Sequence, residues 1–360
     1  MSAPIISADS HVFEPGDLWL RRVDRAFRDR APRVVELPGG GEAMHYADGT
    51  NVPYGGFGSA GDRGRTSSVM PLEEVRSGGF DPAARLQDMR LDGVSAEVLY
   101  PSFGMRLFDL DDPGLQRACM RAYNDWLAEF QAAAPERLLG QALLPLDVDD
   151  AVAELERVAG RGFSGVVISG HPERGKDYAT DRFEKLWRAL ETSRLPASLH
   201  IFTGPYSHRP DAFLSEYSVA TSLVARSLTQ LVFSGVFERY PGLKIVSAEN
   251  DIGWVAHLMQ RMDHAYERKG PRYRHGLSGE LLPSELIRRQ VRCTFMDDRA
   301  GLLTLEVAGP ETFMWASDYP HDDSTFPESR QVIERLFGDL PPEVRHRVVY
   351  QNAADWFGLA

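Results

Sequence analysis

The chain has 360 residues, of which 43% are apolar, and a formal net charge of −12 at pH 7. This length and apolar content suffice for a large core, and the acidic balance argues against nucleic acid or an anionic membrane as a partner. No apolar run approaches the length that spans a membrane. The two cysteines, Cys119 and Cys293, belong to no CxxC motif, so we expect neither a disulfide framework nor a thiolate zinc site.

The first residues and the cysteine content bear on the compartment. The segment Met1–Ile6 is too short and too poor in charge to act as a signal peptide. A chain with two isolated cysteines suits a reducing environment. We therefore predict a cytoplasmic protein whose partner is a small-molecule substrate.

Apolar, β-rich runs alternate with stretches of helical spacing along almost the whole chain. The predicted strands are Ile5–Ala8, Ala96–Tyr100, Gly140–Leu144, Gly165–Ile168, Ala197–Ile201, Lys244–Ala248, Val291–Phe295 and Phe313–Ala316. The predicted helices include Leu115–Ala133, Asp149–Val158, Phe183–Glu191, Ser215–Val232, Ile252–Tyr266 and Glu328–Phe337. Eight strands, mostly followed by helices, predict an α/β fold of the (β/α)8 TIM-barrel type, formed as one domain by residues 1–360. The alternative, a doubly wound sheet, would leave the first and last strands apart.

Residues 32–79 interrupt this alternation, because they are rich in Gly, Pro and polar residues. Long loops of this kind are commonly functional covers or disordered segments. Rings at Tyr46, Tyr54 and Phe57 favour partial order. Two alternatives stay open for this insertion after the first strand: a lid over the site and a floppy loop. Residues 341–359 are predicted to form two short helices that pack on the outside of the barrel.

Two short motifs, one near each end of the chain, carry candidate metal ligands. Asp9 and His11 stand two residues apart, so on an extended strand both point to the same face. Asp318 lies in the motif Ser317–His321, at the end of the last predicted strand. Carboxylate and imidazole are ligands of divalent metals. Residues so distant in sequence meet only if the first strand closes against the last, as it does in a barrel.

Two further strands end in potential ligands. His200 ends the fifth predicted strand, and Glu249 follows the sixth. Each candidate has a plainer interpretation: His200 could be a buried structural histidine, Glu249 could complement a helix dipole, and Asp9 could cap a helix. Asp318 could form a turn before Tyr319. Five polar residues at the carboxyl ends of strands nevertheless favour a site, because active sites of barrels lie there.

Four segments resemble one known family. Ser7–Pro15 resembles the opening motif of the amidohydrolase-related proteins (amidohydrolase 2) grouped with aminocarboxymuconate-semialdehyde decarboxylase, and Ser317–His321 resembles their closing motif. Gly235–Lys244 is similar to the segment that leads into strand six of that family, and Leu195–His200 is similar to its strand five. The resemblance covers nearly the whole chain apart from the Gly-rich insertion.

This resemblance implies a distorted (β/α)8 barrel that binds one divalent metal ion. Asp9, His11, His200 and Asp318 would be its ligands or their immediate neighbours. We expect zinc (Zn²⁺), with manganese (Mn²⁺) and iron (Fe²⁺) as the alternatives. The family contains non-oxidative decarboxylases of aromatic or dienoic acids and hydrolases of lactones, amides or carbon–carbon bonds. It also implies a homo-oligomer, a dimer.

One departure from the family pattern decides the predicted reaction. The family's decarboxylases carry a histidine for proton transfer at the end of strand six, where this chain has Glu249. We therefore predict a hydrolase in which metal-activated water attacks a carbonyl group of a small organic substrate. The predicted catalytic residues are Asp318, which accepts a proton from that water, Glu249, which orients it or completes the coordination, and His200. The predicted substrate contacts are His321, Trp254 and Phe13.

Two alternatives to hydrolysis stay open. In the first, the enzyme is a metal-dependent carboxy-lyase: the metal chelates the carboxylate of a small aromatic or dienoic acid, and a protein acid protonates the carbon. In the second, the barrel is catalytically inactive and acts as a binding protein. Metal content and release of CO2 discriminate between these three functions.

Overall fold

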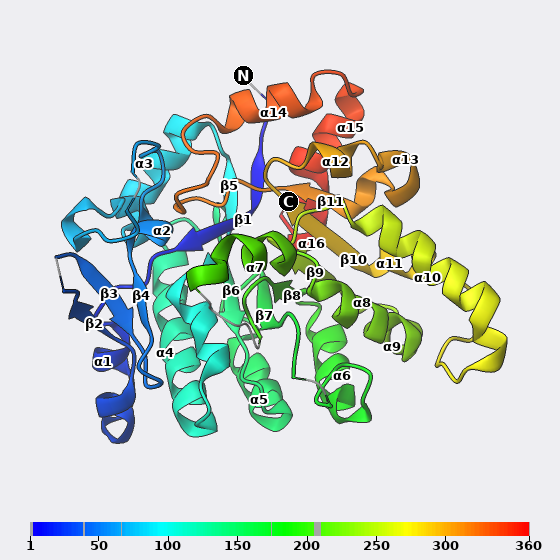
Figure 1. Ribbon diagram of the computed structural model, residues 1–360, viewed down its shortest axis with the longest axis horizontal. Helices are drawn as coiled ribbons and strands as arrows, with labels where there is room; N and C mark the ends of the chain where they lie inside the picture. The colour runs from blue at the N-terminus through cyan, green and yellow to red at the C-terminus, as the bar shows by residue number, and fades with distance from the viewer. Residues whose placement is uncertain (1–2, 39, 66, 174, 205–209, 360) are drawn as a thin grey trace.

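The computed structural model describes residues 3–38, 40–65, 67–173, 175–204 and 210–359, and at its centre eight parallel strands form a nearly closed barrel (Figure 1). The strands are β1 (Ile6–Val12), β5 (Ala96–Pro101), β6 (Leu138–Leu143), β7 (Gly165–Ser169), β8 (Ala197–His200), β9 (Ile245–Ala248), β10 (Val291–Phe295) and β11 (Phe313–Trp315). They are hydrogen-bonded in that order, and all are buried along their length except at the half-buried Arg292. Each strand overlaps one of the eight predicted segments, so the predicted barrel is confirmed.

The seam between β1 and the segment after β11 brings the two ends of the chain together. The amide of Asp318 donates a hydrogen bond to the carbonyl of Asp9 (3.0 Å), and the Ser7 hydroxyl lies 3.0 Å from that of Ser317. The register of β1 against β5 shifts between Ser7 and Ser10, an irregularity that re-aims side chains at a barrel rim. Asp9 therefore lies beside Asp318, as the sequence predicted.

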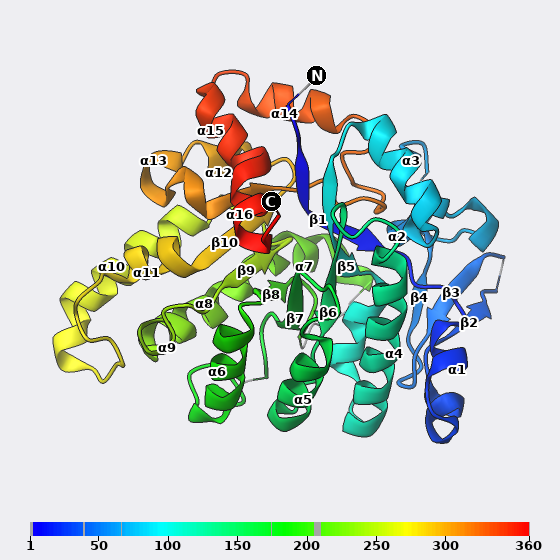
Figure 2. The same cartoon turned by 180° about the vertical axis from the view of Figure 1, so that it is seen from behind.

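Helices surround the barrel (Figures 1 and 2). They are α1 (Leu18–Arg22), α3 (Pro82–Asp92), α4 (Pro113–Gln131), α5 (Val148–Val158), α6 (Glu184–Ser193), α7 (Phe213–Ala220), α8 (Val224–Phe233), α9 (Val236–Arg239), α10 (Val255–Lys269), α11 (Pro283–Gln290), α12 (Arg299–Leu302), α13 (Leu305–Ala308) and α14 (Ser329–Phe337). An aspartate immediately precedes α3, α4 and α5, namely Asp81, Asp112 and Asp147, and each carboxylate accepts one or two hydrogen bonds from backbone amides of the first turn. The predicted helix Ser215–Val232 is in fact two helices, α7 and α8, of which α7 lies in front of the barrel mouth in Figure 1.

The insertion after β1 carries regular structure. It contains a three-stranded antiparallel sheet and a short helix, namely β2 (Arg33–Glu36), β3 (Glu42–His45), β4 (Asn51–Pro53) and α2 (Gly55–Gly58). The amide of Asp322 donates to the carbonyl of Gly56 (3.1 Å), and the amide of Ala60 donates to that of Pro320 (3.1 Å). The insertion is therefore bound to the loop that follows β11, whereas its role as a lid stays a prediction.

The C-terminal segment forms two short helices, α15 (Pro342–His346) and α16 (Asn352–Phe357), joined by a π-helical turn over Arg347–Gln351. The side-chain amide of Asn352 donates to the carbonyls of Pro310 and Phe313. Figure 2 shows α16 over the end of the barrel that faces away from α7. In the part of the chain that the structure describes, no helix combines the length and the apolar character needed to cross a membrane.

Candidate metal centre

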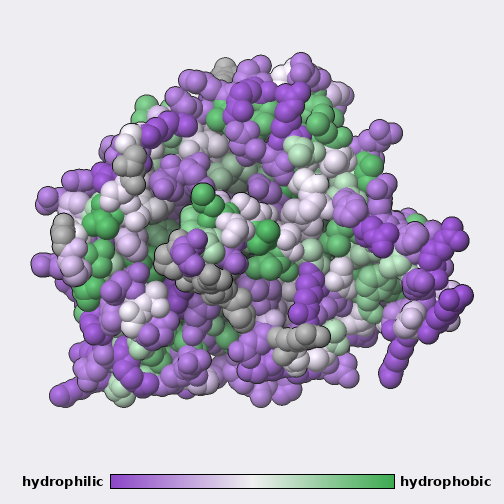
Figure 3. All heavy atoms as spheres, viewed as in Figure 1, coloured by the Kyte–Doolittle hydropathy of each residue, from purple (hydrophilic) through white to green (hydrophobic). Residues whose placement is uncertain are grey.

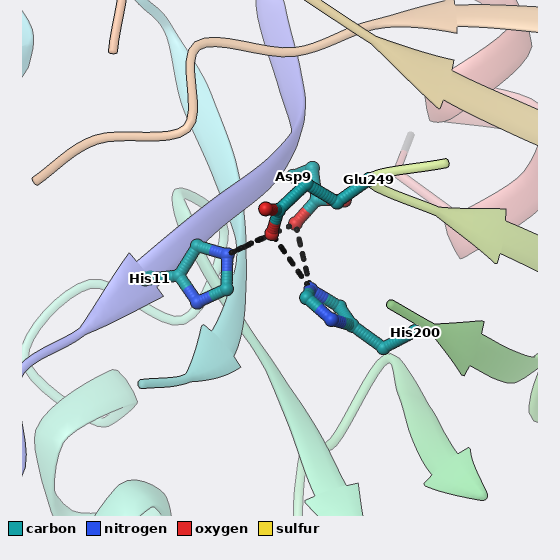
Figure 4. Close-up of side chains that lie close together, drawn as sticks. All are labelled: Asp9, His11, His200 and Glu249. Carbon is teal, nitrogen blue, oxygen red and sulfur yellow. Dashed lines mark ion pairs between the residues drawn. The ribbon is translucent and has the colours of Figure 1, made fainter. Parts of the chain in front are cut away.

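Five side chains from four strand ends converge at the mouth of the barrel. Asp9 and His11 project from β1, His200 ends β8, and Glu249 follows β9 (Figure 4). Asp318 follows β11 and completes the group. These are the five residues that the sequence predicted at the centre.

The ligand-type atoms of the five side chains lie close together. His11 Nε2 is 3.1 Å from Asp318 Oδ1, 3.2 Å from Glu249 Oε2 and 3.6 Å from Asp9 Oδ1. His200 Nε2 is 3.6 Å from Asp9 Oδ1 and 3.5 Å from Glu249 Oε2. Two overlapping groups of four residues could each hold a metal ion: Asp9, His11, His200 and Glu249, and His11, Glu249, Asp318 and His321.

The same five atoms are buried and make no hydrogen bond to the residues that the structure describes. They are Asp9 Oδ1, His11 Nε2, His200 Nε2, Glu249 Oε2 and Asp318 Oδ1. A buried polar atom without a partner costs roughly 1–3 kcal/mol, so five of them facing one another form a costly arrangement for a protein alone. A divalent cation would engage four of these atoms in the group Asp9, His11, His200 and Glu249, and the donor set therefore fits a metal ion.

Both histidines are oriented by backbone carbonyls. Nδ1 of His11 donates to the carbonyl of Pro101 (2.7 Å), and Nδ1 of His200 donates to that of Ile201 (2.9 Å). With the proton held on Nδ1, the lone pair of Nε2 faces the centre. Hydrogen bonds of this kind set the tautomer of metal-bound histidines.

Thr294, at the end of β10, joins two of the acidic residues. Its hydroxyl donates to Asp9 Oδ2 (2.8 Å) and accepts a hydrogen bond from the amide of Glu249 (2.8 Å). Asp9 thus has one oxygen bound to Thr294 and the other free for a metal. The sequence reasoning missed Thr294, although its place at the end of the seventh predicted strand is the signal that could have found it.

His321 lies behind Asp318. Its Nδ1 donates to Asp318 Oδ2 (3.1 Å), and its Nε2 lies 3.1 Å from the hydroxyl of Ser102. The His321 ring also stacks on the His11 ring at 4.0 Å, and the edge of Phe57 from the insertion contacts it. Because both nitrogens of His321 have protein partners, this side chain orients Asp318 in the structure.

Backbone strain coincides with the acidic ligands. Glu249 and Asp318 have φ angles of 55° and 58°, in the left-handed region. Residues other than glycine occupy this region rarely, and such strain is found at functional sites. The sharp bend after each strand directs the carboxylate to the centre.

The charges of the group perturb one another. Burial, and then the negative charge of Asp318, raises the pKa of Glu249 to about 7. Burial also opposes ionisation of Asp318, but its contacts with His321 and His11 outweigh burial and lower its pKa. Burial alone would lower the pKa of His11 and His200, whereas the facing carboxylates raise both pKa values above the ordinary value. The metal-free cluster therefore holds protons that a metal ion would displace.

A cavity opens beside the five side chains. Asp9, Glu249 and Asp318 line it together with Tyr217 and Asp251, and the remaining lining residues are Ile201, Thr221, Thr294, Phe295, Met296 and Ala316. A larger groove of about 480 Å³ lies at the ends of β6 and β7, but none of the predicted site residues lines it. The cavity beside the five side chains is therefore the one adjacent to the candidate metal ligands.

Two predicted substrate contacts lie elsewhere in the structure. Phe13 is fully buried and packs edge-to-face against Tyr54 and Phe103. The indole of Trp254 donates to the carbonyl of Asn250 (2.6 Å). Neither residue is among those that line the cavity. Tyr217, on helix α7, does line the cavity. It was not predicted as a site residue, because the sequence of its helix contains no recognisable motif.

Fold and site together define a (β/α)8 barrel with the donor set of a divalent-metal centre at the carboxyl ends of its strands. The chain belongs to the amidohydrolase family, whose sequence model matches residues 42–359. The decarboxylase orsB of Emericella nidulans is 29% identical over 325 residues, which cover 81% of this chain and 89% of that protein. A gamma-resorcylate decarboxylase of a Rhizobium species is 31% identical over 169 residues, which cover 42% of this chain and only 51% of that enzyme.

Solved structures share the barrel at low sequence identity. An amidohydrolase from Mycobacterium avium subsp. paratuberculosis K-10 has a TM-score of 0.82 and 20% identity, over 99% of this chain and all of that one. A dihydroxybenzoic acid decarboxylase from Polaromonas sp. JS666, solved with bound manganese and the inhibitor 2-nitroresorcinol, has a TM-score of 0.67 and 18% identity, over 99% and 98% of the two chains. At these identities the likeness concerns the fold.

Proposed function

We propose that this protein is a metal-dependent decarboxylase that releases CO2 from a small aromatic acid. The observation that carries the proposal is the convergence of five buried, unpartnered ligand atoms at the barrel mouth. The choice of reaction is supported by the decarboxylases among the relatives. These relatives favour decarboxylation over the hydrolysis that the sequence alone suggested.

The residues that would hold the metal are Asp9, His11, His200 and Asp318, with Glu249 at the more open edge. The side chain of Glu249 is 17% exposed, whereas those of the other four are at most 2% exposed. When bound, a divalent metal would supply positive charge that holds the substrate carboxylate and an adjacent oxygen. Zinc is the ion predicted from the ligand types, and the manganese in the Polaromonas decarboxylase makes Mn²⁺ the second ion to test.

The reaction replaces the carboxylate with a proton: the bond between ring carbon and carboxylate breaks, CO2 leaves, and the carbon takes up H⁺. A protein acid beside the cavity must deliver that proton. Glu249 suits this role, because it lines the cavity and is the most exposed of the five side chains. We infer that Glu249 takes the part of the histidine expected at the end of strand six. His321 keeps Asp318 oriented through the 3.1 Å contact.

Hydrolysis is the second candidate, and Glu249 is also the residue that favours it. Its carboxylate lies 3.2 Å from Nε2 of His11, where it could instead hold a water for attack on a carbonyl. A binding protein without catalysis is the third candidate. The products distinguish the three candidate functions: a decarboxylase releases CO2, a hydrolase cleaves its substrate with water, and a binding protein forms no product.

The test compares products from the metal-loaded protein and its variants. We expect CO2 from 2,6-dihydroxybenzoate or a related hydroxybenzoate and no cleavage of aryl esters, amides or lactones. Glu249→Gln should lower the rate of CO2 release by about 100-fold or more, the usual contribution of a positioned acid. Asp339→Asn, which changes an exposed carboxylate, is the control and should leave the rate unchanged. Ester or lactone cleavage without CO2 release would favour the hydrolase.

A further inference from the structure

One aromatic side chain from a helix stands at the cavity beside the metal centre. Tyr217, on α7, lines this cavity together with Asp9, Glu249 and Asp318. Its hydroxyl donates a hydrogen bond to Asp323 Oδ2 (2.9 Å), in the loop that follows β11. Figure 1 shows α7 in front of the barrel mouth. This hydrogen bond therefore ties α7 to the loop that carries the Asp318 ligand.

The Tyr217 ring has a defined orientation and a partly uncovered surface. It stacks on the ring of Phe213 at 5.5 Å with an interplanar angle of 25°, and on that of Phe202 at 6.3 Å with an angle of 26°. Tyr217 nevertheless keeps 40% of its surface exposed. A ring held by neighbours and by a hydroxyl contact, and lining a cavity, can pack against a planar ligand.

The rest of the cavity wall suits such a ligand. Phe295, Met296 and Ile201 line the cavity together with the carboxylates, so its wall has both apolar and charged surface. A planar ring with a metal-binding group at one end matches both kinds of surface. An open-chain acid would present less flat surface to Tyr217.

We propose that Tyr217 is a specificity-determining substrate contact, positioned by Asp323, that favours acids with an aromatic ring over open-chain acids. This inference rests on the proposed decarboxylase function for its substrate class and adds the residue that selects within it. Tyr217 packs against the substrate ring, and Asp323 acts through Tyr217 by holding its hydroxyl. Neither residue needs to bind the metal.

The experiment measures binding of 2-nitroresorcinol to the manganese-loaded protein by isothermal titration calorimetry. This aromatic compound has no carboxylate to lose, so binding is read separately from turnover. Tyr217→Leu should weaken binding about fivefold, the size of one aromatic contact, whereas Tyr217→Phe, which keeps the ring but loses the hydroxyl that Asp323 holds, should weaken binding less, by about as much as Asp323→Ala does. Asp323→Ala should weaken binding, and Asp323→Asn, which keeps an acceptor oxygen, should restore it. Mn²⁺ affinity should be the same in all four variants.

A control on the same helix separates this role from a general effect of α7. Leu214 is 79% exposed and does not line the cavity, so Leu214→Ala should bind 2-nitroresorcinol like the unchanged protein. Figure 3 shows apolar side chains on the face of the molecule that carries α7. Sorbate, an open-chain dienoic acid, should not distinguish Tyr217→Leu from the unchanged protein.

The outcomes for the two proposals are distinct. The inference is wrong if the unchanged protein does not bind 2-nitroresorcinol, if Tyr217→Leu binds it equally well, or if Leu214→Ala weakens it as much. Loss of Mn²⁺ affinity in Tyr217→Leu would also contradict it. A protein that binds the compound through Tyr217 but releases no CO2 from hydroxybenzoates would instead contradict the proposed reaction.

Discussion

The amide of His11 donates a hydrogen bond to the carbonyl of Tyr319 over 2.6 Å. This contact joins the first strand to the residue after Asp318. Arg85 contacts both residues that this hydrogen bond joins. Its Nη1 donates to the carbonyl of His11 (2.6 Å), and its guanidinium lies 4.4 Å from the Tyr319 ring. Arg85 is fully buried and forms an ion pair with the buried Glu97. One ion pair outside the metal centre therefore braces both segments that supply its ligands.

Replacing this arginine should destabilise the fold strongly. Arg85→Met leaves the Glu97 carboxylate buried without its partner, so the free energy of unfolding should fall by about 3–5 kcal/mol. Urea denaturation of the metal-loaded protein measures this change. Arg63→Met, which breaks an exposed ion pair with Glu328, should cost less than about 1 kcal/mol. Equal losses in the two variants would show that Arg85 has no special role.

Thr294 should influence the metal more than the fold. Thr294→Val keeps the shape of the side chain but removes the hydroxyl that binds Asp9 and Glu249. We expect metal affinity to fall about 10- to 100-fold, as for other residues that orient ligands. Thr312→Val is the matched control, because Thr312 is also fully buried but its hydroxyl donates to the carbonyl of Ala308, away from the candidate ligands. If both variants keep the affinity of the unchanged protein, Thr294 does not orient the ligands.

His321 offers a test between two roles. The sequence suggested a substrate contact, whereas the structure directs both nitrogens to protein partners. His321→Ala should therefore lower metal affinity and kcat through Asp318 and leave KM within about twofold, because a residue that orients a ligand adds no uniform substrate binding. Ser102→Ala should show the same pattern more weakly. A rise in KM with kcat unchanged would support the substrate contact instead.

Metal binding should depend on pH. The facing carboxylates raise the pKa of His11 and His200 despite burial, and burial raises that of Glu249 to about 7. All three raised values favour the protonated metal-free protein, so its stability falls as pH rises from about 5 to 8. Metal binding needs the imidazoles of His11 and His200 deprotonated, so the affinity for metal rises over the same range. The difference in Tm between loaded and metal-free protein should widen with pH. A constant difference would exclude these residues as ligands.

The sequence predicts the barrel and the five converging residues because both depend on local pattern. Strands end where apolar runs end, and the carboxyl ends of barrel strands share one rim. Side-chain direction in irregular segments has no such rule. Phe13 and Trp254 follow strands closely, yet one packs into an aromatic core and the other bonds Asn250. Tyr217 reaches the cavity, and Arg85 reaches the segments that carry the candidate ligands, from helices, where the tertiary fold decides which side chain arrives.

The central claim is metal-dependent loss of a carboxylate from an aromatic acid. It is tested most directly with 2,6-dihydroxybenzoate labelled with ¹³C in its carboxylate, followed by NMR in D2O with the manganese-loaded protein. Labelled CO2 and bicarbonate should appear together with resorcinol that carries one deuterium at the released carbon, and a chelator should stop both. Retention of the label in every hydroxybenzoate tried, by protein shown to contain one metal ion per chain, would contradict the account.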